Sequence, residues 1–321
     1  MPASREVDPG ADALVVGLDV GGTKTAVRAE RADTVVVDTT VPSAEWTAEP
    51  VAEAAAWLHR IVQETVTDDG AGGTPAAIAV GAQGCDDEQH CVELGEALAR
   101  LSGVPTVVTN DAALLLPAAG LARGVGVIAG TGSIAVAVTA GDGLMFAGGW
   151  GWVLGDEGSA PALVREGTRA VLRLHDSGGS DPLLTELLQA FHVPDPPRLA
   201  RAVNDDPSVQ NWVRGTVPLF RAAARGSVIA RDVIAAGARA LAELVLQLHR
   251  RGADTGTVVA AGTVMTRQPL LYDGFTAAIG ELLPASRTVL LTAAPVTGAM
   301  ALARRLLSPV FNAEQPERRP A

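Results

Sequence analysis

The residues best suited to chemistry lie in two short glycine-rich segments that are far apart in the sequence. The first consists of Gly21, Gly22, Thr23 and Lys24, and the second of Gly130, Thr131, Gly132 and Ser133. Glycine turns leave backbone N–H groups free to converge on phosphate oxygens, and Thr, Ser and Lys add further donors. These segments therefore indicate phosphate binding. For the first segment, the alternative is a plain β-turn with an exposed lysine.

Two familiar nucleotide motifs do not fit these segments. A P-loop places its lysine directly after the second glycine and then opens a helix, whereas here Thr23 intervenes and strand-like residues follow. A dinucleotide fingerprint over residues 124–129 would also need a helix, but residues 125–129 favour a strand. The acidic residue Asp19 precedes the first glycines, where its carboxylate can meet Mg²⁺ through a bound water.

A candidate base follows another apolar run. Asn110 and Asp111 come directly after residues 106–109, which predict a strand. A carboxylate at such a strand end can accept a hydroxyl proton as the oxygen attacks a phosphoryl group. An Asp in this place is also an ordinary helix cap, and these residues alone favour the cap.

Two further segments suggest ligand contacts. Residues 148–159 contain five glycines, whose open backbone a ligand can approach closely, together with Trp150 and Asp156. A flat ring and a hydrogen-bonding carboxylate suit a sugar; the alternative is core tryptophans and a turn. Gly262 and Thr263 end a strand-like run, where a flat base could lie against the backbone, although such turns are common.

Strands must position these segments. Residues 14–19 and 25–29 predict a hairpin around the first turn, and residues 125–129 and 134–139 predict another around the second, which indicates a weak internal duplication. Further strands are expected at 34–41, 76–80, 106–109, 257–261 and 288–292. Helices are expected at 50–67, 91–101, after Ser159, and at 231–251, 268–283 and 298–307. Residues 176–206, rich in Pro, Gly and Asp, predict loops around one short helix, and the whole pattern is α/β.

Composition excludes several function classes. The net charge is −11, without a basic run, so nucleic acid is not an expected partner. No signal peptide or membrane-spanning run is apparent, and we expect a cytoplasmic protein. The cysteines Cys85 and Cys91 are too few for a disulfide framework and lack a second ligand pair for zinc, so free thiols are expected.

Taken in order, these segments resemble the actin-like ATPase superfamily of sugar kinases, heat-shock ATPases and actin. They are most similar to the BadF/N-acetylglucosamine kinase family, over Leu14 to about Leu307. The resemblance implies a two-domain actin-like α/β fold (ribonuclease H-like) with an interdomain cleft. The implied domains are 12–114 and 115–296, with a final helix near 297–307 packing back on the first and a disordered tail at 308–321.

The resemblance also implies an ATP-dependent kinase that phosphorylates an amino sugar like N-acetylglucosamine, at the 6-hydroxyl. Asp111 is then the base and Asp19 the Mg²⁺ residue. The implied ATP-binding residues are Asp19, Gly21, Gly22, Thr23, Lys24, Gly130, Thr131, Gly132, Ser133, Gly262 and Thr263. The implied sugar-binding residues are Asn110, Asp111, Gln83, Trp150, Gly151, Asp156 and Glu45. Kinases of this kind are often homodimers, so a homodimer is a possible assembly.

Two departures from the family leave the acceptor open. The loop of residues 42–46 lacks the family's Asn, and Gln83 replaces a small polar residue. Glu45 could pair with a free ammonium, which makes glucosamine an alternative to N-acetylglucosamine. N-acetylmuramic acid is a further alternative within the same family. An alternative of another class is a BadF-type ATPase that activates a partner enzyme through an iron–sulfur cluster, which the close spacing of Cys85 and Cys91 disfavours.

Overall fold

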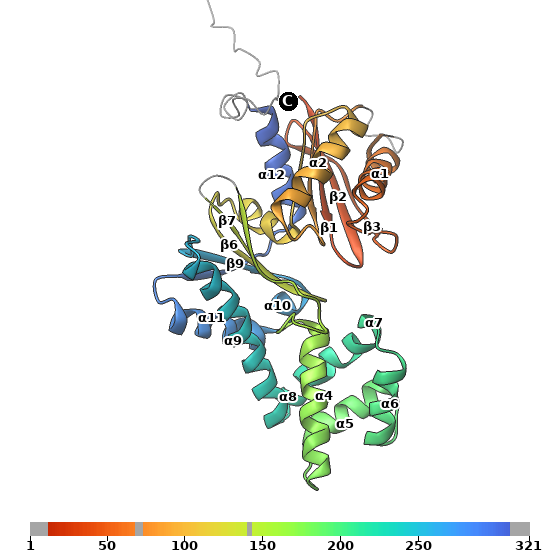
Figure 1. Ribbon diagram of the computed structural model, residues 1–321, viewed down its shortest axis with the longest axis vertical. Helices are drawn as coiled ribbons and strands as arrows, with labels where there is room; N and C mark the ends of the chain where they lie inside the picture. The colour runs from red at the N-terminus through yellow and green to blue at the C-terminus, as the bar shows by residue number, and fades with distance from the viewer. Residues whose placement is uncertain (1–11, 68–72, 140–142, 309–321) are drawn as a thin grey trace, which may run out of the picture. The chain divides into compact units, whose positions relative to one another are not determined.

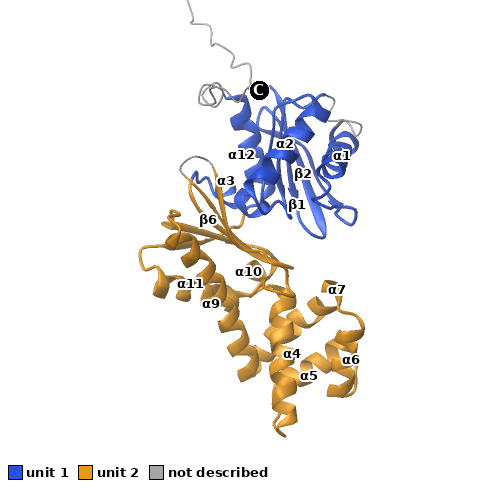
Figure 2. Ribbon diagram, viewed as in Figure 1, with its two compact units in different colours: residues 1–122, 293–321 blue, residues 123–292 orange. Residues whose placement is uncertain are grey.

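The structure is a computed structural model that describes residues 12–67, 73–139 and 143–308 (Figure 1). The chain divides into two compact units (Figure 2). Unit 1 is Met1–Ala122 with Ala293–Ala321, and unit 2 is Arg123–Thr292. The first division lies at 122/123 and not at the expected 114/115, because α3 (Leu115–Ala118) packs against α12 (Val296–Leu307) inside unit 1. From residue 309 on, the predicted tail lies outside the described residues.

Unit 1 contains a five-stranded sheet with the order β3-β2-β1-β4-β5. Its strands are β1 (Leu14–Val20), β2 (Lys24–Arg31), β3 (Thr34–Pro42), β4 (Ala77–Ala82) and β5 (Thr106–Thr109). β1, β2 and β3 form an antiparallel meander, whereas β4 runs parallel to β1 and β5 parallel to β4. β1 and β4 are almost wholly buried, as expected for the continuous apolar runs of a parallel sheet.

The remaining elements of unit 1 are helical. They are α1 (Val51–Val62), η1 (Gln63–Thr67), α2 (Glu88–Ser102), η2 (Asp111–Leu114), α3 and α12. Asp87 caps the start of α2 through the His90 N–H, and Gly103, at φ 72°, ends it. Helix α12 covers the face of β1 that carries Gly17, where a Cβ would lie 2.8 Å from the Met300 sulfur. A glycine here lets the last helix pack closely on the first strand.

Unit 2 repeats this architecture. Its sheet has the order β10-β9-β6-β7-β8, from β6 (Gly124–Ala129), β7 (Ser133–Val138), β8 (Leu144–Gly148), β9 (Thr257–Ala261) and β10 (Arg287–Leu290). In both sheets a three-stranded antiparallel meander is followed by two strands parallel to its first strand. The predicted duplication is therefore confirmed as a shared topology, which local sequence similarity indicates only at the two turns.

The helices of unit 2 are α4 (Ala160–Asp176), α5 (Pro182–Phe191), α6 (Pro196–Asp205), α7 (Val209–Trp212), η3 (Val213–Gly215), α8 (Thr216–Ala224), α9 (Val228–Arg250), α10 (Thr263–Arg267) and α11 (Pro269–Leu282). The prediction of loops around one short helix at 176–206 is wrong. Asp181 and Asp195 are N-caps, and the prolines that follow them occupy the first helical turn. The Pro and Asp residues therefore start helices, as their fixed φ and side-chain acceptors allow.

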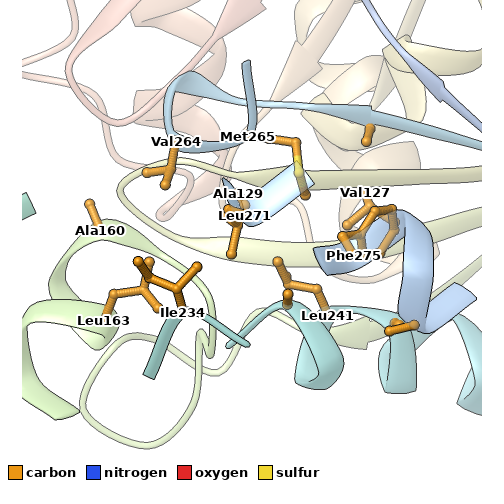
Figure 3. Packing of buried hydrophobic residues seen from close by; sticks show 14 of the residues in the cluster. Val127, Ala129, Ala160, Leu163, Ile234, Leu241, Val264, Met265, Leu271 and Phe275 are labelled. Carbon is orange, nitrogen blue, oxygen red and sulfur yellow. The ribbon is translucent and has the colours of Figure 1, made fainter. Parts of the chain in front are cut away.

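The core of unit 2 lies between the sheet and its helices. Val127 and Ala129 of β6 pack with Leu241 of α9 and with Leu271 and Phe275 of α11, all buried (Figure 3). This core fixes the end of β6, from which the second glycine turn projects. No helix in the described part of the chain combines the length and the apolar character that a membrane span requires.

Candidate active site

Three predicted site residues of unit 1 lie at or just after the carboxyl ends of parallel strands. Within the sheet, Asp19 of β1 pairs with Gly81 of β4, and Gly81 pairs with Thr109 of β5. Because the carboxyl ends of parallel strands meet at one edge, Asp19, Gln83 and Asp111 all lie at that edge. The structure thus brings together the predicted magnesium residue, one predicted sugar ligand and the predicted base.

The first glycine turn joins β1 to β2 at the same edge. The Gly21 N–H donates to the Lys24 carbonyl at 3.1 Å, and the Ser43 N–H donates to the Thr23 carbonyl at 3.2 Å. Neither Gly21 nor Gly22 has a positive φ, so their backbone conformation alone does not require glycine. Glycine at these two positions instead leaves space beside the turn, because it has no Cβ.

Asp19 stands at the end of β1, next to this turn. Burial raises the pKa of its carboxyl to about 6, against a smaller lowering by the charge of Lys24. A carboxylate with this proton affinity is one that a nearby cation would stabilise in its ionised form. No group of three or more His, Cys, Asp or Glu side chains in residues 12–67, 73–139 and 143–308 could hold a metal. A single carboxylate fits Mg²⁺, which keeps most of its waters.

Asp111 opens the short helix η2 after β5. Its Oδ1 accepts the Ala112 N–H at 2.9 Å. Burial raises the pKa of Asp111 to about 7; the charges of Asp19 and Asp86 add to this, and the Ala112 N–H acts against it. A carboxyl that titrates near neutral pH is matched to a role as general base. The helix-cap interpretation applies instead to Asn110, whose Oδ1 also accepts the Ala112 N–H.

Asn110 is buried and joins this edge to the loop after β4. Its amide donates to the Asp86 carboxylate at 3.0 Å and to the Cys85 carbonyl at 3.2 Å. The pKa of Asp86 is raised, chiefly by burial, while the Asn110 amide lowers it. Sequence reasoning missed Asp86, although its place two residues after Gly84 in a predicted sugar loop was a signal that could have found it.

Glu45 and Gln83 lie in the two predicted sugar loops of unit 1. Glu45 lies in the loop after β3, and its carboxylate pairs with the Arg60 guanidinium at 2.7 Å. Glu45 therefore already has a cationic partner. The backbone of Gln83 is fixed, because its N–H donates to the Val20 carbonyl at 2.9 Å and its carbonyl accepts from Trp46 Nε1 at 3.1 Å. The Gln83 side chain lies against the first glycine turn, as described below.

The two cysteines lie beside this network. Cys85 and Cys91 are free thiols and both are buried. The Cys91 thiol donates to the Cys85 backbone carbonyl at 3.5 Å. A side-chain hydrogen bond with Cys91, together with burial, raises the pKa of the Cys85 thiol. Buried thiols of raised pKa are poor metal ligands and poor nucleophiles.

In unit 2, the second glycine turn joins β6 to β7. The Gly130 N–H donates to the Gly132 carbonyl at 2.9 Å, and the Gly130 carbonyl accepts the Ala160 N–H at 2.8 Å, which attaches the turn to the start of α4. Thr131 is exposed at its tip. Ser133 is buried, and its hydroxyl donates to the Glu157 carbonyl at 2.9 Å. The Ser133 hydroxyl therefore binds the loop of residues 148–159 and is not directed to solvent.

Gly262 and Thr263 follow β9, next to the second turn. Gly262 has φ 99°, and a Cβ on it would lie 2.4 Å from the Ala129 carbonyl oxygen. The Thr263 N–H stands 3.7 Å from where a Cβ of Gly130 would be. The structure thus brings the predicted adenosine residues beside the predicted phosphate turn, and glycine is the residue that permits it.

The loop of residues 148–159 is divided between two environments. Trp152 packs on Trp212, with ring centroids 5.7 Å apart, so the core interpretation holds for Trp152. Trp150 is 75% exposed, and Gly151 beside it has φ 80°. Asp156 is buried, and its Oδ2 lies 3.1 Å from where a Cβ of Gly132 would be. Of the predicted sugar ligands in this loop, Asp156 lies against the second turn, and Trp150 is an exposed apolar side chain.

Comparison with known proteins places these features in context. The sequence matches the BadF/BadG/BcrA/BcrD ATPase family over residues 16–303. It is 29% identical, over 318 residues, to N-acetyl-D-glucosamine kinase of Dictyostelium discoideum, with 90% of this chain and 97% of the other covered.

Solved structures share the fold. One is that of a candidate N-acetylglucosamine kinase from Chromobacterium violaceum, with a TM-score of 0.69 and 22% identity over 93% of this chain and 100% of that one. Another is a ROK family glucokinase from Streptomyces griseus in complex with glucose and AMPPNP, with a TM-score of 0.57 and 20% identity over 90% and 98%. The predicted actin-like α/β fold is thereby confirmed.

Proposed function

Because this chain belongs to the BadF/BadG/BcrA/BcrD ATPase family and resembles a curated sugar kinase, we propose that it is an ATP-dependent sugar kinase that phosphorylates an amino sugar. The acceptor is of the N-acetylglucosamine type, and the 6-hydroxyl is the proposed site of transfer. The nucleotide's phosphates bind at the glycine turns 21–24 and 130–133, and its adenosine binds at Gly262 and Thr263.

The observation that carries the proposal is the proton affinity of Asp111. Its carboxyl lies at the same sheet edge as Asp19 and the first glycine turn, and its pKa is raised to about 7, chiefly by burial. A general base is most effective when its pKa lies near the working pH. A carboxylate tuned in this way beside a phosphate turn can take the proton of a sugar hydroxyl, and the similarity to an N-acetyl-D-glucosamine kinase favours a sugar as the nucleophile over water.

In the proposed reaction, the sugar hydroxyl oxygen forms a bond to the γ-phosphorus while the bond from that phosphorus to the β,γ-bridging oxygen breaks. Asp111 takes the hydroxyl proton, and ADP leaves. Backbone N–H groups of the turns and the Lys24 ammonium stabilise the phosphate charge, which is the main source of catalysis in phosphoryl transfer. Asp19 would hold Mg²⁺ through water, and that ion supplies charge neutralisation when bound.

The choice of acceptor rests on two features. The curated relative is an N-acetyl-D-glucosamine kinase. In addition, the Glu45 carboxylate is paired with Arg60, which leaves it less available for the free ammonium of glucosamine. Asp156 accepts hydrogen bonds from the sugar hydroxyls, and Asn110 orients the ring beside Asp111.

The product identifies the function. Purified protein is incubated with ATP, Mg²⁺ and N-acetylglucosamine, and the product is analysed by ³¹P and ¹³C NMR spectroscopy. A phosphate monoester coupled to carbon 6 is expected. A monoester on another carbon would correct the position of transfer, and release of inorganic phosphate without any sugar ester would contradict the proposal.

A further inference from the structure

The backbone of Gln83 is fixed by hydrogen bonds to two other segments of unit 1. Its N–H donates to the carbonyl of Val20 at the end of β1, and its carbonyl accepts from the indole of Trp46 in the loop after β3. The Gln83 side chain is exposed. The backbone therefore has little freedom, while the carboxamide is accessible to a ligand.

The carboxamide of Gln83 lies against the first glycine turn. A Cβ on Gly22 would stand 2.6 Å from Gln83 Oε1 and 3.4 Å from its Nε2 and Cδ. Real Cβ atoms do not approach other atoms as closely as 2.6 Å. Since Gly22 has no positive φ, the backbone does not demand glycine there. The missing Cβ of Gly22 instead makes room for the Gln83 side chain.

This position suggests a role other than the sugar contact that the resemblance implies. As a sugar ligand, Gln83 would act away from the phosphate turn, but its side chain rests on that turn. The carboxamide forms no hydrogen bond with the described residues, so its two N–H donors remain available. An amide that is neutral adds donors here without adding a charge beside Asp19.

We propose that Gln83 is a catalytic residue whose carboxamide Nε2, 3.4 Å from where a Cβ of Gly22 would be, donates hydrogen bonds to the γ-phosphoryl group held at the 21–24 turn. This inference rests on the proposed function, because it assigns Gln83 to the group being transferred. Negative charge is spread over the oxygens of that group as its bond to ADP breaks. A donor that meets the γ-phosphoryl group but not the β-phosphate binds ATP better than ADP and stabilises the transition state.

Two substitutions separate this role from that of a sugar ligand. Gln83→Ala removes the donors, and Gln83→Glu keeps the shape of the side chain but places an acceptor and a negative charge on the turn. Calorimetry without sugar measures the binding of AMPPNP and of ADP in the presence of Mg²⁺. Gln83→Glu should weaken AMPPNP binding most, because its charge also repels the phosphates. For Gln83→Ala we expect AMPPNP to bind about tenfold or more weakly, the effect of losing a charge-assisted hydrogen bond. ADP binding should change by no more than about threefold, because only the γ group is contacted.

Steady-state kinetics with N-acetylglucosamine give the second arm. For Gln83→Ala we expect kcat to fall about 10- to 100-fold, with the KM for the sugar within about twofold of the wild-type value. Gln247→Glu is the matched control for Gln83→Glu, because it makes the same change at an exposed residue of α9 that has no part in the proposed site, and it should leave all values unchanged.

Two results would overturn the inference. A raised KM for the sugar, with kcat and the ratio of AMPPNP to ADP affinity both unchanged, would return Gln83 to its predicted role as a sugar ligand. If Gln83→Ala weakened the binding of AMPPNP and of ADP equally, the substitution would act by disturbing the structure of the turn and not by removing a contact with the γ-phosphoryl group. The calorimetric arm needs no sugar, so it decides the role of Gln83 even if the wild-type protein phosphorylates no sugar and the proposed function fails.

Discussion

Asp19 and Asp111 lie at the ends of two strands of one sheet, and the charge of Asp19 adds to burial in raising the pKa of Asp111 to about 7. The residue proposed to hold Mg²⁺ therefore also influences the residue proposed as base. The parallel register of β1, β4 and β5 produces this relationship, because it ends the three strands at one edge.

The pH dependence of activity reports the ionisation of Asp111. A base acts only when it is unprotonated, so kcat/KM for the sugar should fall as the pH drops below about 7, tenfold for each further unit once the group is mostly protonated. The measurement is a pH–rate profile between pH 5 and 9 in buffers of constant ionic strength. A profile that stays flat down to pH 5 would show that no group with this pKa controls the reaction.

Asp111→Asn should separate activity from stability. The pKa of Asp111 is about 7 in the folded protein, against a value of 3.8 for an ordinary Asp, which we take for the unfolded chain. Between these two pH values the folded protein holds a proton on Asp111 that the unfolded chain has lost. The contribution of Asp111 to the free energy of unfolding therefore declines as the pH rises from about 4 to 7, and the cost of burying its charge is complete above pH 7. Asn removes that cost and can still accept the Ala112 N–H.

We accordingly expect Asp111→Asn to raise the melting temperature at pH 8 by about 2 °C or more, the shift that ~1 kcal/mol gives in a protein of this size. The gain should be smaller at pH 5. Differential scanning calorimetry of both proteins at the two pH values tests this, and a lower melting temperature of the variant at pH 8 would refute the burial of an ionised carboxylate.

Gly262 should be intolerant of any side chain. Gly262→Ala places a Cβ 2.4 Å from the Ala129 carbonyl oxygen at a φ of 99°, and we expect it to cost about 2–4 kcal/mol of unfolding free energy. Gly280→Ala is the matched control, since a Cβ there meets nothing within 4 Å in helix α11 and should stabilise by ~0.5–1 kcal/mol. Urea unfolding compares the two, and equal costs would mean that the close approach of β9 to β6 is not as described.

Glu45→Gln tests the identity of the acceptor. Because Glu45 pairs with Arg60 in an exposed ion pair, its loss should change stability by less than ~1 kcal/mol. We expect the ratio of kcat/KM for N-acetylglucosamine over glucosamine to exceed one and to stay within about twofold in the variant. Glucosamine turnover that is high in the wild type and lost in Glu45→Gln would instead support the ammonium contact that the sequence suggests.

The sequence predicts the features that depend on local patterns. The two glycine turns, the strands that flank them and the position of Asp111 follow from alternation of residue types over a few positions. The helices α5 and α6 were missed because Asp181, Asp195 and the prolines after them are equally typical of loops.

Contacts between loops are beyond such patterns. The Asn110–Asp86 hydrogen bond joins residues 24 positions apart, and the placement of the Gln83 carboxamide on Gly22 depends on a side-chain conformation set by packing. The periodic pattern of apolar residues in the sequence predicts neither of these two contacts. The sequence therefore predicts which loops form the site, whereas the structure is needed to assign the side chains within them.

The most direct test of the central claim is sugar-dependent ADP release by the wild-type protein and by Asp111→Asn, over a panel of amino and neutral hexoses. We predict that N-acetylglucosamine gives the largest stimulation of the wild type, and that Asp111→Asn binds AMPPNP normally but loses about 10²- to 10⁴-fold in kcat. ADP release that no sugar stimulates, or near-normal turnover by Asp111→Asn, would contradict the account.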